Sequence, residues 1–353
     1  MKLLVIETDK IIKNIEKIRI KTKSRIIAVV KANGYGLGLD GLVKILLAQG
    51  IDFFAVTELR DAIYIRQNLS ETADILYMGT ILCEENAEKI VMNSITAMIS
   101  NENDAKLLNS TGEKFEVLAK AHIKINTGMN RYGFDNLNDV LNLKKYDKIE
   151  FLGIFTHFHS AMNRQAVDRQ MTMFNKILSG CEKFNFQCVH VCNSYATMNY
   201  ADLHFNTVRV GSAILGRVSG SYGLGKVGYI KTYISAINVL KKGESVGYRA
   251  GFTAKSDMKT AVLPLGSFDG LNITKNDDIF TPIEVLRSMY HKFKMLNKSL
   301  FVTVNGEKCR ILGKIALNST VFDITNIVCE LGDEVTIDVN PLYVSSEIER
   351  FYV

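Results

Sequence analysis

The chain has 353 residues, of which 47% are hydrophobic and 23% are charged, and its formal net charge is +6. This length favours one large domain plus a smaller one, and this composition excludes a mostly disordered or fibrous chain. The apolar runs are too short to span a bilayer, and the opening MKLLVIETDK turns acidic before an apolar signal segment can form. We therefore expect a cytoplasmic protein that has no membrane partner.

The cysteines and the positive charges are both spread along the chain. The six cysteines form no CxxC pair and no regular spacing, which argues against a zinc site or a disulfide framework. The densest basic stretch, residues 13–25, alternates with apolar residues at helical spacing and so predicts a solvated helix face. We expect no nucleic-acid partner, whereas small anionic ligands are favoured.

Strands and helices alternate through the first 222 residues. Apolar runs predict eight strands, at residues 26–30, 52–56, 74–78, 95–99, 117–126, 150–158, 186–192 and 206–211. Helical periodicity is found between most of them, at residues 40–50, 57–69, 84–92 and 167–178. Eight alternations are typical of a (β/α)8 TIM barrel, an α/β fold whose active site lies at the carboxyl ends of the strands.

Closely spaced β-type segments after about residue 222 predict a second, mostly β-strand domain. One helix is expected within it, because Thr281 and Glu284 form a capping box with Pro282 at the first helical position. The predicted domains are therefore residues 1–222 and 223–353.

The first candidate for chemistry is Lys31, in IIAVVKANGYGLG. We predict that it is the last residue of a barrel strand and that the glycine-rich turn after it is flexible enough to approach a ligand closely. Such a lysine is a catalytic amine, an anchor for a Schiff base or a polar residue at the rim, and its position alone leaves these alternatives open.

Other candidates follow later strands. Arg131 in KINTGMNRYGF comes after a glycine turn, where it is either a surface residue or a fork for a carboxylate or phenolate. Ser194 in NSYATM, together with the amides of Gly211 and Ser212 in TVRVGSAILG, is suited to cradle a phosphate, and a helix could start at that glycine. Each of these signals is weak when taken separately.

Two histidines in THFHS stand two residues apart, which suggests a metal site. His157 and His159 have no carboxylate or cysteine cluster nearby in the sequence to supply further ligands. We therefore favour packed or hydrogen-bonded histidines and expect no metal.

Five of these segments together resemble a known family. AVVKANGYG, KINTGMNRYGF, FTHF, NSYA and VRVGSAILG occur in the order and approximate spacing of the alanine racemase family. These are pyridoxal-phosphate enzymes with an N-terminal (β/α)8 barrel and a C-terminal β domain. The resemblance covers nearly the whole chain, because ESVGYRAGFTA (244–254) and LGDEVTI (331–337) look like segments of the second domain.

The resemblance implies which residues hold the cofactor, pyridoxal 5'-phosphate. It makes Lys31 the Schiff-base lysine and Arg209 the residue that faces the pyridine nitrogen. Since guanidinium stays protonated, that nitrogen would stay unprotonated and the ring would be a weaker electron sink. The implied phosphate contacts are Tyr35, Ser194 and the amides of Gly211 and Ser212.

The resemblance also implies the residues around the substrate. Arg131 would hold the cofactor's phenolate oxygen and the substrate carboxylate, and His157 would help to fix the ring. Leu317 would keep a backbone contact to the substrate carboxylate. Lys124 matches a lysine that is carbamylated in some members and orients the arginine; a plain solvated lysine is the alternative.

Racemisation removes a proton on one face and returns one on the other, so two acid/base groups are needed. The resemblance assigns these roles to Lys31 and Tyr248. A phenol is protonated near pH 7, so Tyr248 needs nearby positive charge to act as a base. In the family this tyrosine comes from the partner in a head-to-tail homodimer, so a monomer is expected to be nearly inactive.

The chain departs from the family pattern around the substrate entrance. Ser267 stands where the family commonly has a tyrosine that narrows the entrance. Leu317-Asn318-Ser319 stands where the family usually has Met-Asp-Gln, and Asn318 removes a negative charge. Lys314 replaces an arginine of the entrance corridor.

The C-terminus departs as well, because it is short and lacks the segment with a tyrosine that helps to bind the phosphate. Tyr343 does not align with that tyrosine. The helix around 281–295 looks like an insertion and could cover a widened entrance.

These features leave several functions open. An alanine racemase is the default, and a racemase of serine or of a larger or basic amino acid is the close variant. A non-catalytic pyridoxal-phosphate carrier or regulatory relative is a second class, although a carrier has no need of Tyr248 as a proton donor. A barrel decarboxylase lacks support, because its glycine-triplet loop and cysteine-aspartate motif are missing.

Overall fold

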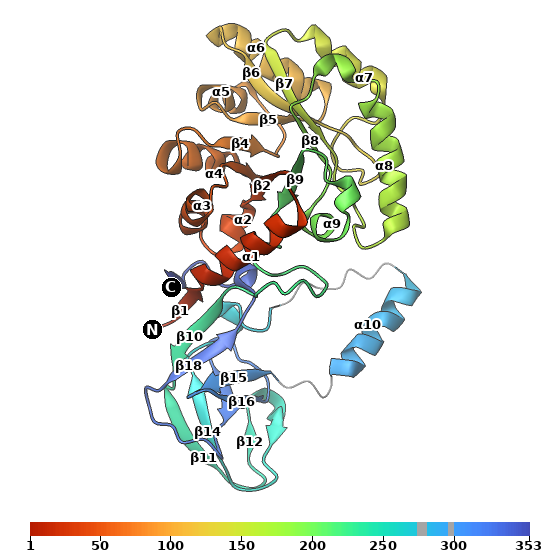
Figure 1. The fold of residues 1–353 in the computed structure, drawn as a ribbon. Helices are drawn as coiled ribbons and strands as arrows, with labels where there is room; N and C mark the ends of the chain where they lie inside the picture. The colour runs from red at the N-terminus through yellow and green to blue at the C-terminus, as the bar shows by residue number, and fades with distance from the viewer. Residues whose placement is uncertain (274–280, 296–299) are drawn as a thin grey trace. The chain divides into compact units, whose positions relative to one another are not determined.

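A computed structural model describes residues 1–273, 281–295 and 300–353, and it divides into two compact units. The first unit is Thr8–Val227, and the second joins Met1–Glu7 to Gly228–Val353. The first seven residues therefore belong with the second half of the chain. The two units are taken separately below (Figure 1).

The first unit is a nearly closed barrel of eight parallel strands, in the order β8-β7-β6-β5-β4-β3-β2-β9. The strands are β2 (Arg25–Val29), β3 (Phe53–Val56), β4 (Asp74–Tyr77), β5 (Thr96–Ile99), β6 (Ala119–Lys124), β7 (Ile149–Phe155), β8 (Cys188–His190) and β9 (Thr207–Val210). At the seam after β8, the Arg209 N–H donates to the Cys192 carbonyl (3.0 Å). The predicted barrel and all eight of its predicted strands are confirmed.

Helices surround these strands (Figure 1). They are α1 (Thr8–Lys21), α3 (Leu39–Ala48), α4 (Leu59–Tyr64) continued by a π-helical turn (Ile65–Leu69), α5 (Glu84–Met92), α6 (Glu102–Phe115), α7 (Leu137–Asn142), α8 (Arg164–Leu178) and α9 (Ser194–Asn199). Their apolar residues recur at helical spacing, so that Ile11, Ile15 and Ile18 of α1 are buried on one face. Asparagine side chains cap the first turns of α6, α7, α8 and α9.

The barrel interior is filled by side chains from several strands. Ile27, Phe53, Ala55, Leu76 and Cys188 form one buried cluster. Alternate residues of a strand point to opposite faces, so one set fills the interior while the other packs against the helices. The packed interior leaves the carboxyl ends of the strands as the place for a cavity.

The second unit is built on a nine-stranded sheet, in the order β11-β14-β17-β16-β15-β18-β10-β1-β19. Its strands are β1 (Leu3–Ile6), β10 (Tyr229–Tyr233), β11 (Ala236–Leu240), β14 (Met258–Leu263), β15 (Phe301–Val304), β16 (Glu307–Leu312), β17 (Thr320–Asp323), β18 (Glu334–Asp338) and β19 (Glu349–Tyr352). A separate hairpin joins β12 (Ser245–Val246) to β13 (Phe252–Thr253). The mostly β character is as predicted, but β1 was not predicted.

The predicted helix of this unit is α10 (Pro282–Met295). Its capping box forms as expected: the Glu284 N–H donates to Thr281 Oγ1 (3.3 Å), and the Thr281 N–H donates to Glu284 Oε2 (2.9 Å). Across the described parts of the chain, none of the helices has the length and apolar character needed to cross a membrane.

Candidate active site

A cavity of about 700 Å³ opens at the carboxyl ends of the barrel strands. Its lining carries five cationic side chains, namely Lys31, Lys124, Arg131, Arg209 and Arg217. Among the described residues that line it, Glu58 is the only carboxylate. Such an excess of positive charge favours an anionic ligand.

Lys31 reaches this cavity from an unusual turn. The prediction that it ends a strand was wrong by two residues, because β2 ends at Val29 and Lys31 opens the short element α2 (Lys31–Tyr35). Ala32, Asn33, Gly34 and Tyr35 have φ of 53°, 52°, 63° and 54°, so the chain makes a left-handed helical turn here. The predicted glycine turn is thus a defined structure that holds Lys31 and Tyr35 on one cavity.

Left-handed backbone costs about 1–2 kcal/mol for each residue that has a Cβ, so neighbouring groups must hold this turn in place. The Asn33 side-chain oxygen accepts a hydrogen bond from the Leu39 N–H (2.8 Å). The Gly34 N–H donates to the Val30 carbonyl (3.0 Å). Stored strain of this kind is typical of functional sites.

The amine of Lys31 is open to the cavity. Desolvation lowers its pKa, and the positive charge of Arg131 lowers it further. A lowered pKa increases the neutral fraction, which is the form that attacks a carbonyl or accepts a proton.

Three of the predicted phosphate contacts lie against one another. A Cβ on Gly211 would lie 2.5 Å from the Tyr35 hydroxyl oxygen, so a larger residue at this position would displace the Tyr35 ring. Burial raises the pKa of Tyr35 to about 12, which keeps its hydroxyl a donor. Ser194 Oγ accepts from the N–H groups of Gly211 (2.9 Å) and Ala213 (3.2 Å), so its own O–H is left to donate.

Ser212 also lines the cavity, but the segment after β9 differs from one expectation. Residues 211–216 form turns instead of a helix start, with the Ile214 N–H donating to the Gly211 carbonyl (3.0 Å). The predicted Gly211 amide points at the Ser194 hydroxyl here. The Gly211 amide is therefore engaged by Ser194, and the cradle consists of the Tyr35 and Ser194 hydroxyl groups together with the predicted amide of Ser212.

Arg209 is 4% exposed and is fixed by several acceptors. Its Nη1 donates to His190 Nδ1 (2.5 Å) and to the His190 carbonyl (2.9 Å), while Nη2 donates to the Thr156 carbonyl (2.7 Å) and lies 3.4 Å from His157 Nδ1. Burial lowers the pKa of Arg209 to about 10, so it still carries its charge at neutral pH.

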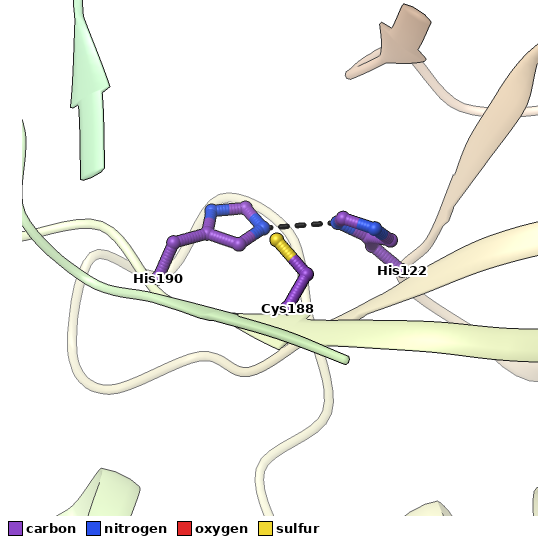
Figure 2. A group of neighbouring side chains, drawn as sticks. All are labelled: His122, Cys188 and His190. Atoms are coloured by element: carbon purple, nitrogen blue, oxygen red, sulfur yellow. Dashed lines mark hydrogen bonds between the residues drawn. The ribbon is translucent and has the colours of Figure 1, made fainter. Parts of the chain in front are cut away.

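Two buried histidines behind Arg209 were not identified from the sequence. His122 Nδ1 and His190 Nε2 lie 2.9 Å apart, and Figure 2 shows the two rings joined with Cys188 beside them. Because Arg209 donates to His190 Nδ1, the other nitrogen of His190 carries the proton and donates to His122. The signal available was the alternation of these histidines with apolar residues in AKAHIK and CVH.

The same three side chains place nitrogen and sulfur atoms within 4.8 Å of one another, as metal ligands would be. The two imidazole nitrogens are already joined by a hydrogen bond, and the Cys188 thiol donates to Thr207 Oγ1 (3.3 Å). Burial, followed by the charge of Arg209, lowers the pKa of His122 to about 3 and that of His190 well below its usual value. The arrangement therefore serves to hold Arg209.

Lys124 is 6% exposed, and its Nζ lies 4.7 Å from the centroid of the Phe155 ring. Arg209 contacts the same ring, with its Cζ 5.0 Å from the centroid. Burial first, and then the charges of Arg209 and Arg131, lower the pKa of Lys124 well below its usual value. Its neutral form is therefore favoured at a place where a third cation, beside Arg209 and Arg131, is unfavourable.

The remaining barrel candidates differ in their surroundings. Arg131 and His157 both line the cavity, and burial together with the nearby cations lowers the pKa of His157 to about 3. His159 Nδ1 lies 2.9 Å from Ser160 Oγ in an exposed loop, so the two histidines of THFHS do not form a common site.

The structure thus gathers nine predicted residues on one cavity, and these are Lys31, Tyr35, Lys124, Arg131, His157, Ser194, Arg209, Gly211 and Ser212. Sequence reasoning missed Arg217 and Glu58 among the lining residues. Glu58 lies two residues after β3, and Arg217 directly follows the turn at residues 212–216. Nothing in the sequence around either residue indicates a place in a cavity.

The other predicted residues belong to the second unit. Tyr248, in a short turn (Tyr248–Ala250), is 73% exposed, and Leu317 is 61% exposed. Ser267 begins a short helical turn (Ser267–Asp269), and Tyr343 ends another (Pro341–Tyr343). These residues do not line the barrel cavity, which is formed by the first unit alone.

Comparisons with known proteins agree with this architecture. Residues 6–218 match the family model of the alanine racemase N-terminal domain, and residues 227–342 match that of the alanine racemase C-terminal domain. The relative "Alanine racemase 1" of Oceanobacillus iheyensis is 27% identical over 349 residues, covering 94% of this chain and 87% of the relative. The alanine racemase of Methanococcus maripaludis is 28% identical over 349 residues, which also cover 94% of this chain and 87% of the relative.

Solved structures show the same fold. The alanine racemase of Clostridium difficile aligns with 100% of this chain and 95% of its own, with a TM-score of 0.85 at 23% identity. That of Streptomyces coelicolor aligns with 100% of this chain and 98% of its own, with a TM-score of 0.85 at 20% identity. Because the family models match most of its length, this chain belongs to the alanine racemase family of pyridoxal-phosphate-dependent isomerases.

Proposed function

We propose that this protein interconverts L- and D-alanine with pyridoxal phosphate, using Lys31 and Tyr248 as its two acid/base groups. The observation that carries the proposal is the cavity itself. It holds a lysine of lowered pKa, a cluster of hydroxyl and amide donors, and a buried arginine at separate positions of one lining. These are the three functions that a phosphorylated pyridine aldehyde needs from its protein.

The residues present fit this cofactor. The absence of a Cβ at Gly211 lets the Tyr35 hydroxyl lie close against the backbone of the cradle. Tyr35 and Ser194 offer O–H donors to phosphate oxygens, and Arg209 offers N–H donors to a pyridine nitrogen. Lys31 would provide the covalent attachment, and Arg131 would bind the phenolate oxygen.

When bound, pyridoxal phosphate supplies an electron-withdrawing ring that acidifies the α-hydrogen of an attached amino acid. The chain's own residues decide what happens to that hydrogen. Lys31 Nζ accepts it or returns it on one face, and the lowered pKa makes both directions accessible. Arg209 remains a donor because His190 and Thr156 fix it, so it limits how strongly the ring withdraws electrons.

The second proton donor comes from outside the barrel cavity in this proposal. We assign it to the hydroxyl of Tyr248 of the partner subunit in a head-to-tail homodimer. The exposure of Tyr248 in the single chain supports this assignment, since a group that serves a partner's cavity must be accessible. Alanine would bind by its carboxylate to Arg131 and to the backbone at Leu317.

We further propose that Lys124 is carbamylated. Its neutral amine would attack carbon dioxide, forming an N–C bond and releasing one proton. The product is an anion at a place where Arg131 and Arg209 both disfavour a cation. The carbamate would orient Arg131 and remove the repulsion between buried positive charges.

The remaining assignments of the proposal concern context. We infer a cytoplasmic enzyme of D-alanine biosynthesis, whose barrel ends near residue 222 and whose C-terminal domain of about residues 223–353 contributes the catalytic tyrosine. The departures at Ser267 and Asn318 then tune the entrance without altering the cofactor chemistry.

A racemase for a basic amino acid is a second candidate, favoured by one observation. Glu58 is the only carboxylate among the described residues of a lining that is otherwise rich in cations. A carboxylate in the lining suits the ammonium group of a lysine-like side chain.

The test is a racemisation assay by chiral chromatography with all common L-amino acids, on the protein loaded with pyridoxal phosphate. We expect conversion of alanine, abolished by Lys31→Ala and by Tyr248→Phe. Turnover of lysine or arginine that Glu58→Gln removes would replace alanine with a basic substrate. Cofactor binding without turnover of any amino acid would overturn the racemase proposal and favour a carrier.

A further inference from the structure

The predicted phosphate cradle lacks a cation of its own. A phosphate monoester carries between one and two negative charges near neutral pH. Tyr35, Ser194 and the turn amides are neutral donors, and Arg209, which His190 and Thr156 hold in place, is assigned to the pyridine nitrogen instead of the phosphate. A charged donor would bind a phosphate about twice as strongly as a neutral one.

Arg217 lies on the segment that forms this cradle. It follows Gly211 by six residues and lines the same cavity as Gly211 and Ser212. The backbone N–H of Arg217 donates to the Ser212 carbonyl (2.8 Å), which brings the two residues together across a turn. Its Nη2 donates to the Val227 carbonyl (3.2 Å), so the side chain has a defined direction.

The segment that carries Arg217 is firmly built. A Cβ on Gly216 would lie 2.0 Å from the Gly225 carbonyl oxygen, so the two sides of this loop are in close contact. Asn14 of α1 is fully buried and donates to the carbonyls of Ile214 (2.9 Å) and Gly225 (2.8 Å), while accepting from the Gly225 N–H (2.8 Å). An arginine placed by such a clamp is pre-organised for a ligand.

We propose that Arg217 binds the phosphate of pyridoxal phosphate and provides the positive charge that the hydroxyl and amide donors lack. This inference rests on the proposed use of that cofactor.

The test measures cofactor affinity instead of turnover. Equilibrium binding of pyridoxal phosphate and of pyridoxal, which has no phosphate, is followed by absorbance in wild type, Arg217→Met and Arg217→Lys. Arg169→Met on the exposed face of α8 is the matched control for loss of one arginine. Unfolding midpoints of all variants are measured alongside.

We expect Arg217→Met to raise the dissociation constant of pyridoxal phosphate about tenfold or more and that of pyridoxal less than about twofold. Arg217→Lys should recover most of the affinity, and Arg169→Met should change neither ligand. Equal losses for both ligands, or none for either, would overturn the proposal. If the methionine variant does not fold, the same comparison is made with Arg217→Lys and Arg217→Gln.

The outcome separates this inference from the proposed function. A wild-type protein that binds pyridoxal phosphate but racemises no amino acid would overturn the racemase proposal. The affinities of the Arg217 variants would still decide whether Arg217 binds the phosphate. A wild-type protein that binds no pyridoxal phosphate would overturn both.

Discussion

The two units of the chain hold their candidate residues in opposite ways. In the barrel, Arg209, Lys124 and Ser194 are 4%, 6% and 7% exposed, and hydrogen bonds or ring contacts hold each of them in place. In the β unit, Tyr248 and Leu317 are 73% and 61% exposed. Cofactor binding is therefore expected to belong to a single chain, whereas turnover is expected to require an assembly.

Replacing Lys31 in the barrel is expected to have the largest effect on activity. We expect Lys31→Ala to lower racemisation at least about 1000-fold, because the amine is both the attachment point and one of the two bases. Covalent trapping of the cofactor by borohydride, read by mass spectrometry, should disappear as well. Lys44→Ala, on the exposed face of α3, is the control and should retain both properties. Activity that survives in Lys31→Ala would remove the barrel cavity from the proposed chemistry.

Tyr248→Phe tests the β side. We expect racemisation to fall about 10²- to 10⁴-fold, since one acid/base group is lost, while the affinity for pyridoxal phosphate stays within about twofold. Exchange of the α-hydrogen in D₂O should continue for one enantiomer, because Lys31 still serves one face.

Tyr233→Phe in β10 is the matched control, and it should leave rate and affinity unchanged. A Tyr248→Phe protein whose cofactor affinity falls as far as its activity would place the tyrosine in the binding site of its own chain. The prediction that the barrel binds the cofactor, while the β unit supplies only a proton donor, would then be wrong.

The sequence predicts the barrel more completely than the β unit. Each barrel strand pairs with a strand next to it in the chain, apart from β9 with β2, so the alternation of apolar runs and helices is a sufficient signal. β1 pairs with β10 and β19, more than 200 residues away, and four apolar residues carry no information on such a partner. Its assignment to the second unit could only come from the structure.

A similar limit applies to the site. Lys31 and Arg131 could be predicted because glycines follow or precede them at strand ends. His122 and His190 could not, because a histidine within an apolar strand looks like any other core residue until its partner two strands away in the barrel is known. The left-handed turn was also missed, since alanine and tyrosine, the residue types at positions 32 and 35, rarely adopt positive φ.

Histidine burial predicts that the two units respond differently to acid. His122, His157, His190 and His204, all in the barrel, have lowered pKa values, with burial as the main cause, whereas the sequence of the second unit has only His291. A lowered folded-state pKa means that the unfolded chain binds more protons, so stability present above about pH 6.5 is lost as the pH falls. At pH 5.5 a histidine as buried as His122 should cost about 1 kcal/mol relative to pH 8.

Urea unfolding at pH 8, 6.5 and 5.5, with proteolysis and mass spectrometry to identify the cleaved unit, measures this effect. We expect the barrel midpoint to fall with pH more than that of the β unit. His159→Gln, which removes an exposed histidine, should not change the trend. A barrel midpoint independent of pH would show that these imidazoles are not held neutral.

The smallest expected effect is the loss of stability when a glycine of either unit is replaced by alanine, and it separates backbone strain from side-chain packing. Gly34 has a φ of +63°, and a Cβ there would lie 3.2 Å from Leu42 Cδ2, whereas Gly243 of the second unit has a φ of +89° and nothing within 4 Å. Both alanine variants incur the cost of left-handed backbone, about 1–2 kcal/mol, but only Gly34→Ala must also displace a buried leucine. We therefore expect the urea midpoint to fall further for Gly34→Ala than for Gly243→Ala. Equal falls would mean that the turn after Lys31 has room to spare, and its fixed geometry would then come from the Asn33 and Val30 hydrogen bonds alone.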